Sequence, residues 1–354
     1  MTHRPSAPFF LAVGLVVAAG LPACGDGGPP AVDLTGVWIG TYSTQDGATG
    51  PILVDLTQSS SGELSGGLEV IGPAIPDGNS GVWVSGAVHG HEASITVNGA
   101  DDRVTATEAS GTLHGTIASG SVTAGFGASR VETRSMKVAT TRPPGGRIPR
   151  LLAAQGGALW FYDWYDNSLQ KTDDKGAVTA TVKLETRGRC EGGFDGCGDK
   201  LLCSNAARLI WVDPSSSQVT AQTLPGGLHA GGVTCGPSNV WVDQGTTKAQ
   251  NLQALNKTSG SPEGAGLHLP GILTDLAFDG TDLWALEFFP PILLRVSTSS
   301  GAILAAYQIP AARSTTTVLN GLTWDGNALW TLLTTHGGGG SDTVVAARLE
   351  VDRP

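Results

Sequence analysis

Four short segments of the chain place acidic side chains beside aromatic ones, or carry a histidine next to a glycine run. Carboxylates attract positive charge, and the faces of Trp, Tyr and Phe pack against apolar or sugar-like surfaces. Such residues suit a ligand that combines an apolar or sugar-like face with a positive group. The candidate ligand-binding residues are Asp163, Trp164, Tyr165, Asp243, Glu287, Phe288, Phe289 and His336.

Signatures of catalysis or metal binding are absent from the sequence. There is no Gly-x-Ser-x-Gly elbow, no His-Glu-x-x-His pair and no phosphate-binding loop. His89 and His91 are separated by one glycine and form an incomplete set of metal ligands. We therefore expect no catalytic residue, no metal and no cofactor.

The cysteines bear on the compartment. Cys24 ends the string Leu21-Pro22-Ala23-Cys24, which follows a positive start and an apolar stretch from Phe9 to Ala19. This string resembles a bacterial lipobox. The resemblance implies a signal peptide over residues 1–23, acylation of Cys24 and a flexible tether over residues 24–32. The protein is then extracytoplasmic and anchored in a bacterial membrane, and Gly25 gives a mild preference for the outer membrane.

Four cysteines remain, an even number: Cys190, Cys197, Cys203 and Cys235. In an oxidising compartment such a set favours two disulfides, and three pairings are open. Their spacing contains no Cys-x-x-Cys, which argues against zinc.

Composition indicates an all-β protein. The chain has 51 Gly and 20 Pro in 354 residues, and no long segment shows helical periodicity. Its net charge of −10 disfavours nucleic acid or anionic lipid as the main partner.

A run of prolines and glycines at residues 141–147 predicts a linker. The part before it, residues 33–140, reads as a meander of eight short strands separated by turn residues. Such a meander could close into a small antiparallel barrel, with a sandwich as the alternative. The opening Gly36-Val37-Trp38 resembles the first strand of lipocalin-like and streptavidin-like barrels, which implies a structural role for the tryptophan.

Residues 148–354 contain an internal repeat of about 40 residues. The string from Leu276 to Trp284 returns from Leu322 to Trp330, and weaker copies end at Trp160, Cys203 and Trp241. Each copy is followed by an apolar strand, a turn and another strand. The pattern resembles the bacterial propellers that include glutaminyl cyclotransferase-like and streptogramin-lyase-like proteins. It predicts a five-bladed propeller, with six blades as the alternative, and a closing outer strand around Met136–Thr140.

Together these features favour a non-enzymatic, lipid-anchored binding or scaffold protein. The ligand would lie at the propeller mouth, where the loops with the aromatic and acidic residues meet. The partner could be a protein, a glycan or a small molecule. The alternative is a lyase or hydrolase that uses the acidic residues of the mouth with a metal.

Overall fold

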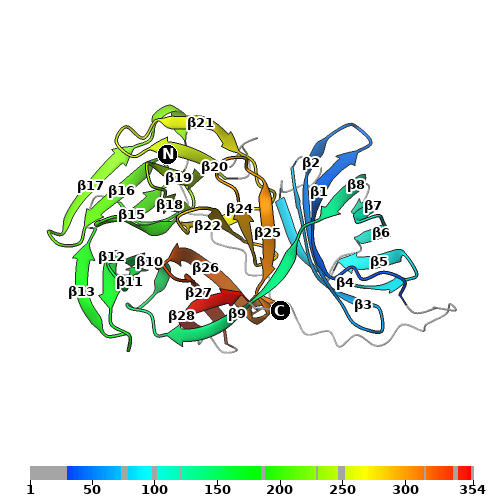
Figure 1. The fold of residues 1–354 in the computed structure, drawn as a ribbon, viewed down its shortest axis with the longest axis horizontal. Coiled ribbons are helices and arrows are strands. Elements are labelled where there is room, and N and C mark those ends of the chain that lie inside the picture. The colour runs from blue at the N-terminus through cyan, green and yellow to red at the C-terminus, as the bar shows by residue number, and fades with distance from the viewer. Residues whose placement is uncertain are drawn as a thin grey trace, which may run out of the picture.

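The computed structural model describes residues 30–72, 79–97, 102–119, 122–184, 188–228, 230–245, 252–314, 316–337 and 342–351. The predicted signal peptide, Cys24 and most of the tether lie outside these ranges. Within the ranges, none of the helices has the length and apolar character that a membrane span requires. Nearly all the regular secondary structure of the described chain is β-strand (Figure 1).

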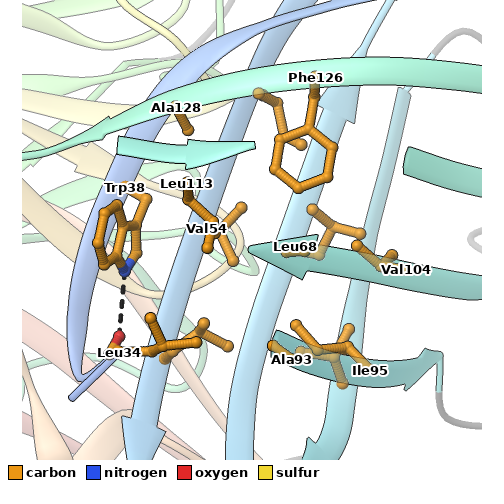
Figure 2. Packing of buried hydrophobic residues seen from close by; sticks show 14 of the residues in the cluster. Leu34, Trp38, Val54, Leu68, Ala93, Ile95, Val104, Leu113, Phe126 and Ala128 are labelled. Carbon is orange, nitrogen blue, oxygen red and sulfur yellow. Dashed lines mark hydrogen bonds between the residues drawn. The ribbon is translucent and has the colours of Figure 1, made fainter. Parts of the chain in front are cut away.

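The first eight strands form a closed, barrel-like sheet in sequence order, with β1 pairing to β8. Alternate side chains point inward, and Trp38 lies among them with its indole N–H donating to the carbonyl of Leu34 at 3.0 Å (Figure 2). The strands are β1 (Gly36–Thr44), β2 (Thr49–Gln58), β3 (Glu63–Ile71), β4 (Asn79–His89), β5 (Glu92–Val97), β6 (Arg103–Ala109), β7 (Thr112–Ser119) and β8 (Val122–Arg130).

The later strands form antiparallel units that surround a common axis. The first strand of each unit contacts the first strands of its neighbours, so that β10, β14, β18, β22 and β26 make a closed ring. The arrangement is propeller-like (Figure 1). The first two units are β10 (Pro149–Gln155), β11 (Ala158–Asp163), β12 (Ser168–Thr172) and β13 (Val178–Lys183), then β14 (Phe194–Cys197), β15 (Lys200–Asn205), β16 (Arg208–Asp213) and β17 (Gln218–Thr223).

The third and fourth units are β18 (Val233–Cys235), β19 (Asn239–Asp243), β20 (Leu252–Asn256) and β21 (Pro262–Leu267), then β22 (Leu273–Phe278), β23 (Leu283–Glu287), β24 (Ile292–Val296) and β25 (Ile303–Gln308). The last unit is β26 (Thr317–Trp324), β27 (Leu329–His336) and β28 (Asp342–Val351), completed by β9 (Thr133–Arg142).

Strand β9 joins the last unit to the fourth. Its residues Met136–Arg142 pair with β28, and Thr133–Ser135 pair with β25, which makes one eight-stranded sheet. The closing strand that we expected around Met136–Thr140 is therefore β9. The domain boundary predicted at residue 140 falls inside this strand, because the last barrel strand ends at Arg130.

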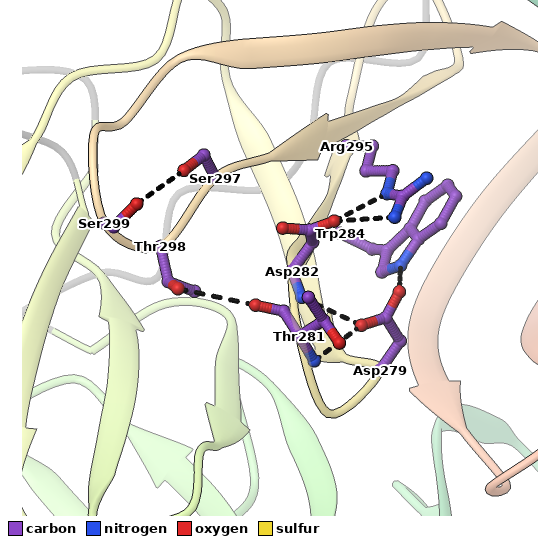
Figure 3. A network of polar contacts seen from close by, with 8 residues as sticks. All are labelled: Asp279, Thr281, Asp282, Trp284, Arg295, Ser297, Thr298 and Ser299. Atoms are coloured by element: carbon purple, nitrogen blue, oxygen red, sulfur yellow. Dashed lines mark hydrogen bonds and ion pairs between the residues drawn. The ribbon is translucent and has the colours of Figure 1, made fainter.

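The repeated Asp-Gly turn has a clear physical cause. In the fourth unit, one carboxylate oxygen of Asp279 accepts the backbone N–H groups of Thr281 and Asp282, and the other accepts the indole N–H of Trp284 at 2.8 Å (Figure 3). Asp325 holds Trp330 in the same way at 2.7 Å. The aspartate thus ties the turn to the tryptophan that packs between units.

Two disulfides are present, as predicted. Cys190 pairs with Cys203, and Cys197 pairs with Cys235, with a Cα–Cα distance of 5.4 Å in each case. The second disulfide joins β14 to β18 across adjacent units, which adds a covalent link to the ring.

The outer face of the barrel packs against the fourth unit (Figure 1). Val37 and Leu53 point away from the barrel interior and belong to the same apolar cluster as Leu276 and Leu294. Beside them, buried Asp55 pairs with Arg313 at 3.1 Å. Both faces of the barrel wall are therefore buried where it meets the ring.

Candidate functional site

One end of the ring repeats the same local arrangement in three units. An acidic residue ends the second strand of the unit, and a glycine of the connection from the preceding unit passes directly over its carboxylate. A Cβ atom on the glycine would lie 2.5, 2.6 and 2.0 Å from the nearest carboxylate oxygen, so only glycine allows the approach. The pairs are Gly146 with Asp163, Gly231 with Asp243 and Gly271 with Glu287.

In the first unit, this acid is saturated with hydrogen bonds. Asp163 is fully buried and accepts the backbone N–H of Arg147 at 2.6 Å and that of Tyr165 at 2.9 Å. Longer contacts come from the backbone of Ile148 and Asp166 and from the Gln170 amide. The sequence suggested Asp163 as a ligand-binding residue, but its oxygens are already occupied by the protein and hold the loop in shape.

In the fourth unit, the equivalent acid lacks a hydrogen-bond partner within the part of the chain that the structure describes. Glu287 is 1% exposed, and neither of its carboxylate oxygens has a hydrogen-bond partner among the described residues. Asp243 of the third unit is intermediate: it is buried and accepts the Gly245 backbone N–H at 2.9 Å. The structure therefore brings Asp243 and Glu287 into electrostatic contact, as their shared place in the repeat suggested.

A third acid completes the cluster, and the sequence did not indicate it. Glu69 lies on β3 of the barrel, points outward to the ring, and accepts the Ile272 backbone N–H with both oxygens at 3.3 Å. Its only sequence signal is an acid within the apolar run Leu68-Glu69-Val70-Ile71, on the face where Gly67 allows Pro290 to approach. We call Glu69, Asp243 and Glu287 the junction acids.

Burial dominates the electrostatics of the junction acids. It raises the pKa of Glu69 to about 8, although the Ile272 N–H opposes the rise. Burial also raises the pKa of Glu287 well above its usual value, and the charges of Glu69 and Asp243 raise it further. The pKa of Asp243 rises to about 6 for the same main reason. Cations do not contribute to any of these pKa shifts.

Two further buried acids lie on the inner strands and are structural. Asp195 accepts the hydroxyls of Thr234 and Thr323 at 2.5 and 2.6 Å, and Asp275 accepts the backbone N–H groups of Leu276 and Leu322 at 2.9 and 3.0 Å. Burial raises the pKa of Asp195 to about 6 and that of Asp275 well above its usual value. These bonds link the inner strands across the ring. The oxygens of the two acids are therefore already occupied by donors of the protein itself.

The aromatic residues of the first unit lie under arginines. Arg147 is stacked 3.8 Å from the ring centre of exposed Tyr165, while Arg150 and Arg189 lie 5.0 and 4.8 Å from that of Trp164. Within the described part of the chain, none of the three guanidinium groups donates a hydrogen bond or forms an ion pair. These residues form an exposed patch, here called the arginine–aromatic patch.

The remaining candidates do not join either group. Phe288 is 55% exposed, whereas Phe289 packs edge-on against Trp83 of the barrel with ring centres 4.7 Å apart. Phe289 therefore contacts the barrel rather than open solvent. His336 pairs with Asp342 at 3.1 Å on the last unit.

The barrel interior offers little space for a ligand. A cavity of about 130 Å³ lies toward one end and is lined by apolar side chains such as Val82 and Ile117, with Tyr42 beside them. Ligand pockets are usually several hundred Å³. This cavity is therefore smaller than an ordinary ligand pocket.

Comparison with known proteins finds similar solved structures but no family. No family model matches the chain, and no curated protein matches it either. Among solved structures, it is similar to the glutaminyl cyclase of Myxococcus xanthus, with 13% identity over 63% of this chain and 100% of the other, and a TM-score of 0.48. It is also similar to regucalcin, a calcium-binding protein of Agrobacterium tumefaciens, with 12% identity over 62% and 96% of the two chains and a TM-score of 0.38. Apo AztD of Citrobacter koseri shares 11% identity over 77% and 96%, with a TM-score of 0.30.

Proposed function

We propose that this protein is a lipid-anchored, extracytoplasmic and non-enzymatic binding protein whose five-bladed propeller presents the arginine–aromatic patch to an acidic polysaccharide. The observation that carries the proposal is the set of three guanidinium groups that lie over aromatic rings and form no ion pair with any of the residues that the structure describes. In a chain of net charge −10, exposed arginines normally find acids nearby. Here they remain available for a partner.

The patch is organised before any partner arrives. Arg147 and Arg150 flank the start of β10, and Arg189 is fixed by the adjacent Cys190–Cys203 disulfide. The backbone carbonyl of Arg189 also accepts the Asn205 amide at 2.7 Å. Stacking on an aromatic ring orients each guanidinium plane and leaves its N–H edge free, which lowers the entropy lost on binding.

The chemistry of the patch favours carboxylates on sugar rings. A guanidinium fork binds a carboxylate through two parallel hydrogen bonds, and the Tyr165 ring, in a residue 58% exposed, suits the apolar face of a sugar. The three arginines and Tyr165 are exposed at the surface, so an extended chain fits the patch better than an enclosed small molecule. This partner carries negative charge, which differs from the positive group that the acidic loops suggested.

Binding of polygalacturonate to the purified full chain tests the proposal. We expect binding that weakens as salt rises toward 0.15 M and a loss of about tenfold or more in affinity in an Arg150→Glu/Arg189→Glu variant, because two charge-assisted contacts are reversed. Arg208→Glu changes another exposed arginine and should leave the affinity unchanged. Equal loss in the control, or binding to anionic vesicles in place of the polysaccharide, would contradict the proposal.

The anchor is tested separately. Cys24→Ser removes the proposed acylation site, so we expect the variant to leave the membrane fraction for the soluble fraction while its affinity for polygalacturonate stays the same. Retention of the variant in the membrane fraction would exclude acylation of Cys24 as the means of attachment.

A further inference from the structure

We propose that a hard divalent cation of the calcium–magnesium class binds between Glu69 of the barrel and Glu287 of the ring. The two carboxylates come from different parts of the fold and meet under one residue. A Cβ atom on Gly271 would lie 2.0 Å from Glu287 Oε2 and 2.8 Å from Glu69 Oε2. The two oxygens are therefore within about 5 Å of each other, a distance at which two like charges strongly disfavour each other.

The strongest indication of a missing partner is Glu287 itself. Its side chain is buried and directed toward Glu69 and Asp243, and both of its oxygens lack a hydrogen bond among the described residues. Buried polar groups are almost always satisfied, and a buried carboxylate without a partner is costly. Asp163, at the same place in the first unit, shows that this fold can supply backbone donors to such an acid.

Positive side chains do not neutralise the pair. Among the described residues, no lysine, arginine or histidine forms an ion pair with Glu69 or Glu287, whereas Asp55, on the neighbouring strand β2, has Arg313. Both glutamates are 1% exposed, so an organic ammonium ligand is too large to reach them. A small cation is the partner that fits.

Carboxylate oxygens select hard cations over zinc or copper. The described residues include no group of three or more His, Cys, Asp or Glu side chains arranged to hold a metal ion. The proposed site therefore has two protein carboxylates, with water completing the coordination and Asp243 contributing charge from a greater distance. Such a site is of modest affinity, and it would join the barrel to the fourth unit of the ring.

Thermal unfolding of the purified full chain at pH 8 tests the site, with calcium chloride and magnesium chloride as separate probes after treatment with EDTA. Extracellular calcium modules have Kd values of about 0.1–1 mM, so each salt is added to about 5 mM. We expect Tm to rise by about 3 °C or more with at least one of the two cations. Glu287→Gln and Glu69→Gln should each abolish the rise, whereas Glu92→Gln, at an exposed acid on β5 of the barrel, should keep it.

A second measurement holds even if a variant fails to fold. Because burial raises the pKa of Glu69 to about 8, this carboxyl holds a proton at neutral pH, and a bound cation must displace it. Titration calorimetry of the wild-type chain in two buffers of different ionisation enthalpy should show release of about one proton per cation at pH 7. Absence of both the Tm rise and the proton release, or a rise that persists in both glutamine variants, would overturn the proposal.

Discussion

Asp163 and Glu287 occupy the same place in two units of one repeat, yet their surroundings are opposite. Each ends the second strand of its unit beneath a glycine. The loop of the first unit folds back over Asp163 and donates backbone N–H groups to it. At the fourth unit the barrel wall occupies that side, and it brings Glu69 instead of donors.

This difference separates a structural acid from a functional one. A repeat supplies the position of a carboxylate, but the neighbouring segment decides whether the carboxylate is satisfied. Where a second domain covers the position, the acid loses water without gaining donors. The junction acids are the result, and they are the part of this molecule that most needs a ligand.

The largest expected effect is at Asp163, the acid whose oxygens are occupied by hydrogen bonds. Asp163→Ala removes the acceptor of several buried N–H groups and should lower the free energy of unfolding by about 3 kcal/mol, because those donors lose their partner without gaining water. Urea unfolding measures the change. Asp166→Ala, at an exposed acid of the same loop, should change stability by less than about 0.5 kcal/mol. A small effect at Asp163 would remove the contrast between the two units.

The second prediction concerns pH in the absence of divalent cations. The pKa of Glu69 is about 8 in the folded chain against an ordinary value of 4.5. Below pH 4.5, Glu69 is protonated in both the folded and the unfolded chain, and the stability linked to this group is fully present. As pH rises from 4.5 toward 8, the unfolded chain has lost the proton while the folded chain has kept it, so stability falls, and the loss levels off above 8 where both states are ionised.

Between pH 6 and pH 8 we expect Glu69 to contribute a loss of about 2 kcal/mol. Glu287 and Asp275, whose pKa values are also raised well above the usual range, act in the same direction. The rises at Asp195 and Asp243 reach only to about 6 and act mainly at lower pH. Urea unfolding at each pH measures the slope. Glu69→Gln should make this window flatter, and Glu92→Gln should leave it as in the wild type. A slope equal in both variants would assign the pH dependence to other groups.

The sequence predicted the repeat because its motif recurs locally along the chain. It predicted two disulfides because four cysteines remain after Cys24. The Asp-Gly turn is visible in the chain since Asp279 bonds to residues within five positions of it. Pairing of Cys197 with Cys235 and the role of Glu69 have no such signal. Glu69 meets Ile272 at a sequence separation of 203, and only the docking of the barrel against the ring brings them together.

The ligand-binding role of the candidate residues stays a prediction, but the structure shows where they lie. Asp243 and Glu287 share a place in the repeat, and the structure brings them together. The sequence cannot show that Asp163 is saturated or that arginines cover Trp164 and Tyr165, because these outcomes depend on loop conformation. Phe289 looked like a ligand contact, yet it faces Trp83, which no local pattern could reveal.

A third prediction reverses the usual sign of a core mutation. Glu287→Gln should raise the free energy of unfolding at pH 8 by about 1–2 kcal/mol without divalent cations, because unfolding no longer gains from ionisation of the released glutamate. At pH 4 the difference should vanish, since the glutamate is then protonated in both states. Urea unfolding at the two pH values checks this, and a destabilised variant at pH 8 would mean that Glu287 already has a partner.

The smallest expected effect tests whether the barrel causes the difference between the two acids. Trp83→Ala removes the edge-to-face contact with Phe289 and should cost about 1 kcal/mol, and a double-mutant cycle with Phe289→Ala should give a coupling energy of similar size. Loosening this contact admits water at the junction, so the pKa of Glu69 should fall toward its ordinary value. Carbon-detected NMR titration of the glutamate carboxyls measures that fall, with Glu92 as the internal reference. If the pKa of Glu69 stays near 8 while the coupling energy is lost, the barrel is not what isolates Glu287 from water, and the contrast with Asp163 must arise within the fourth unit itself.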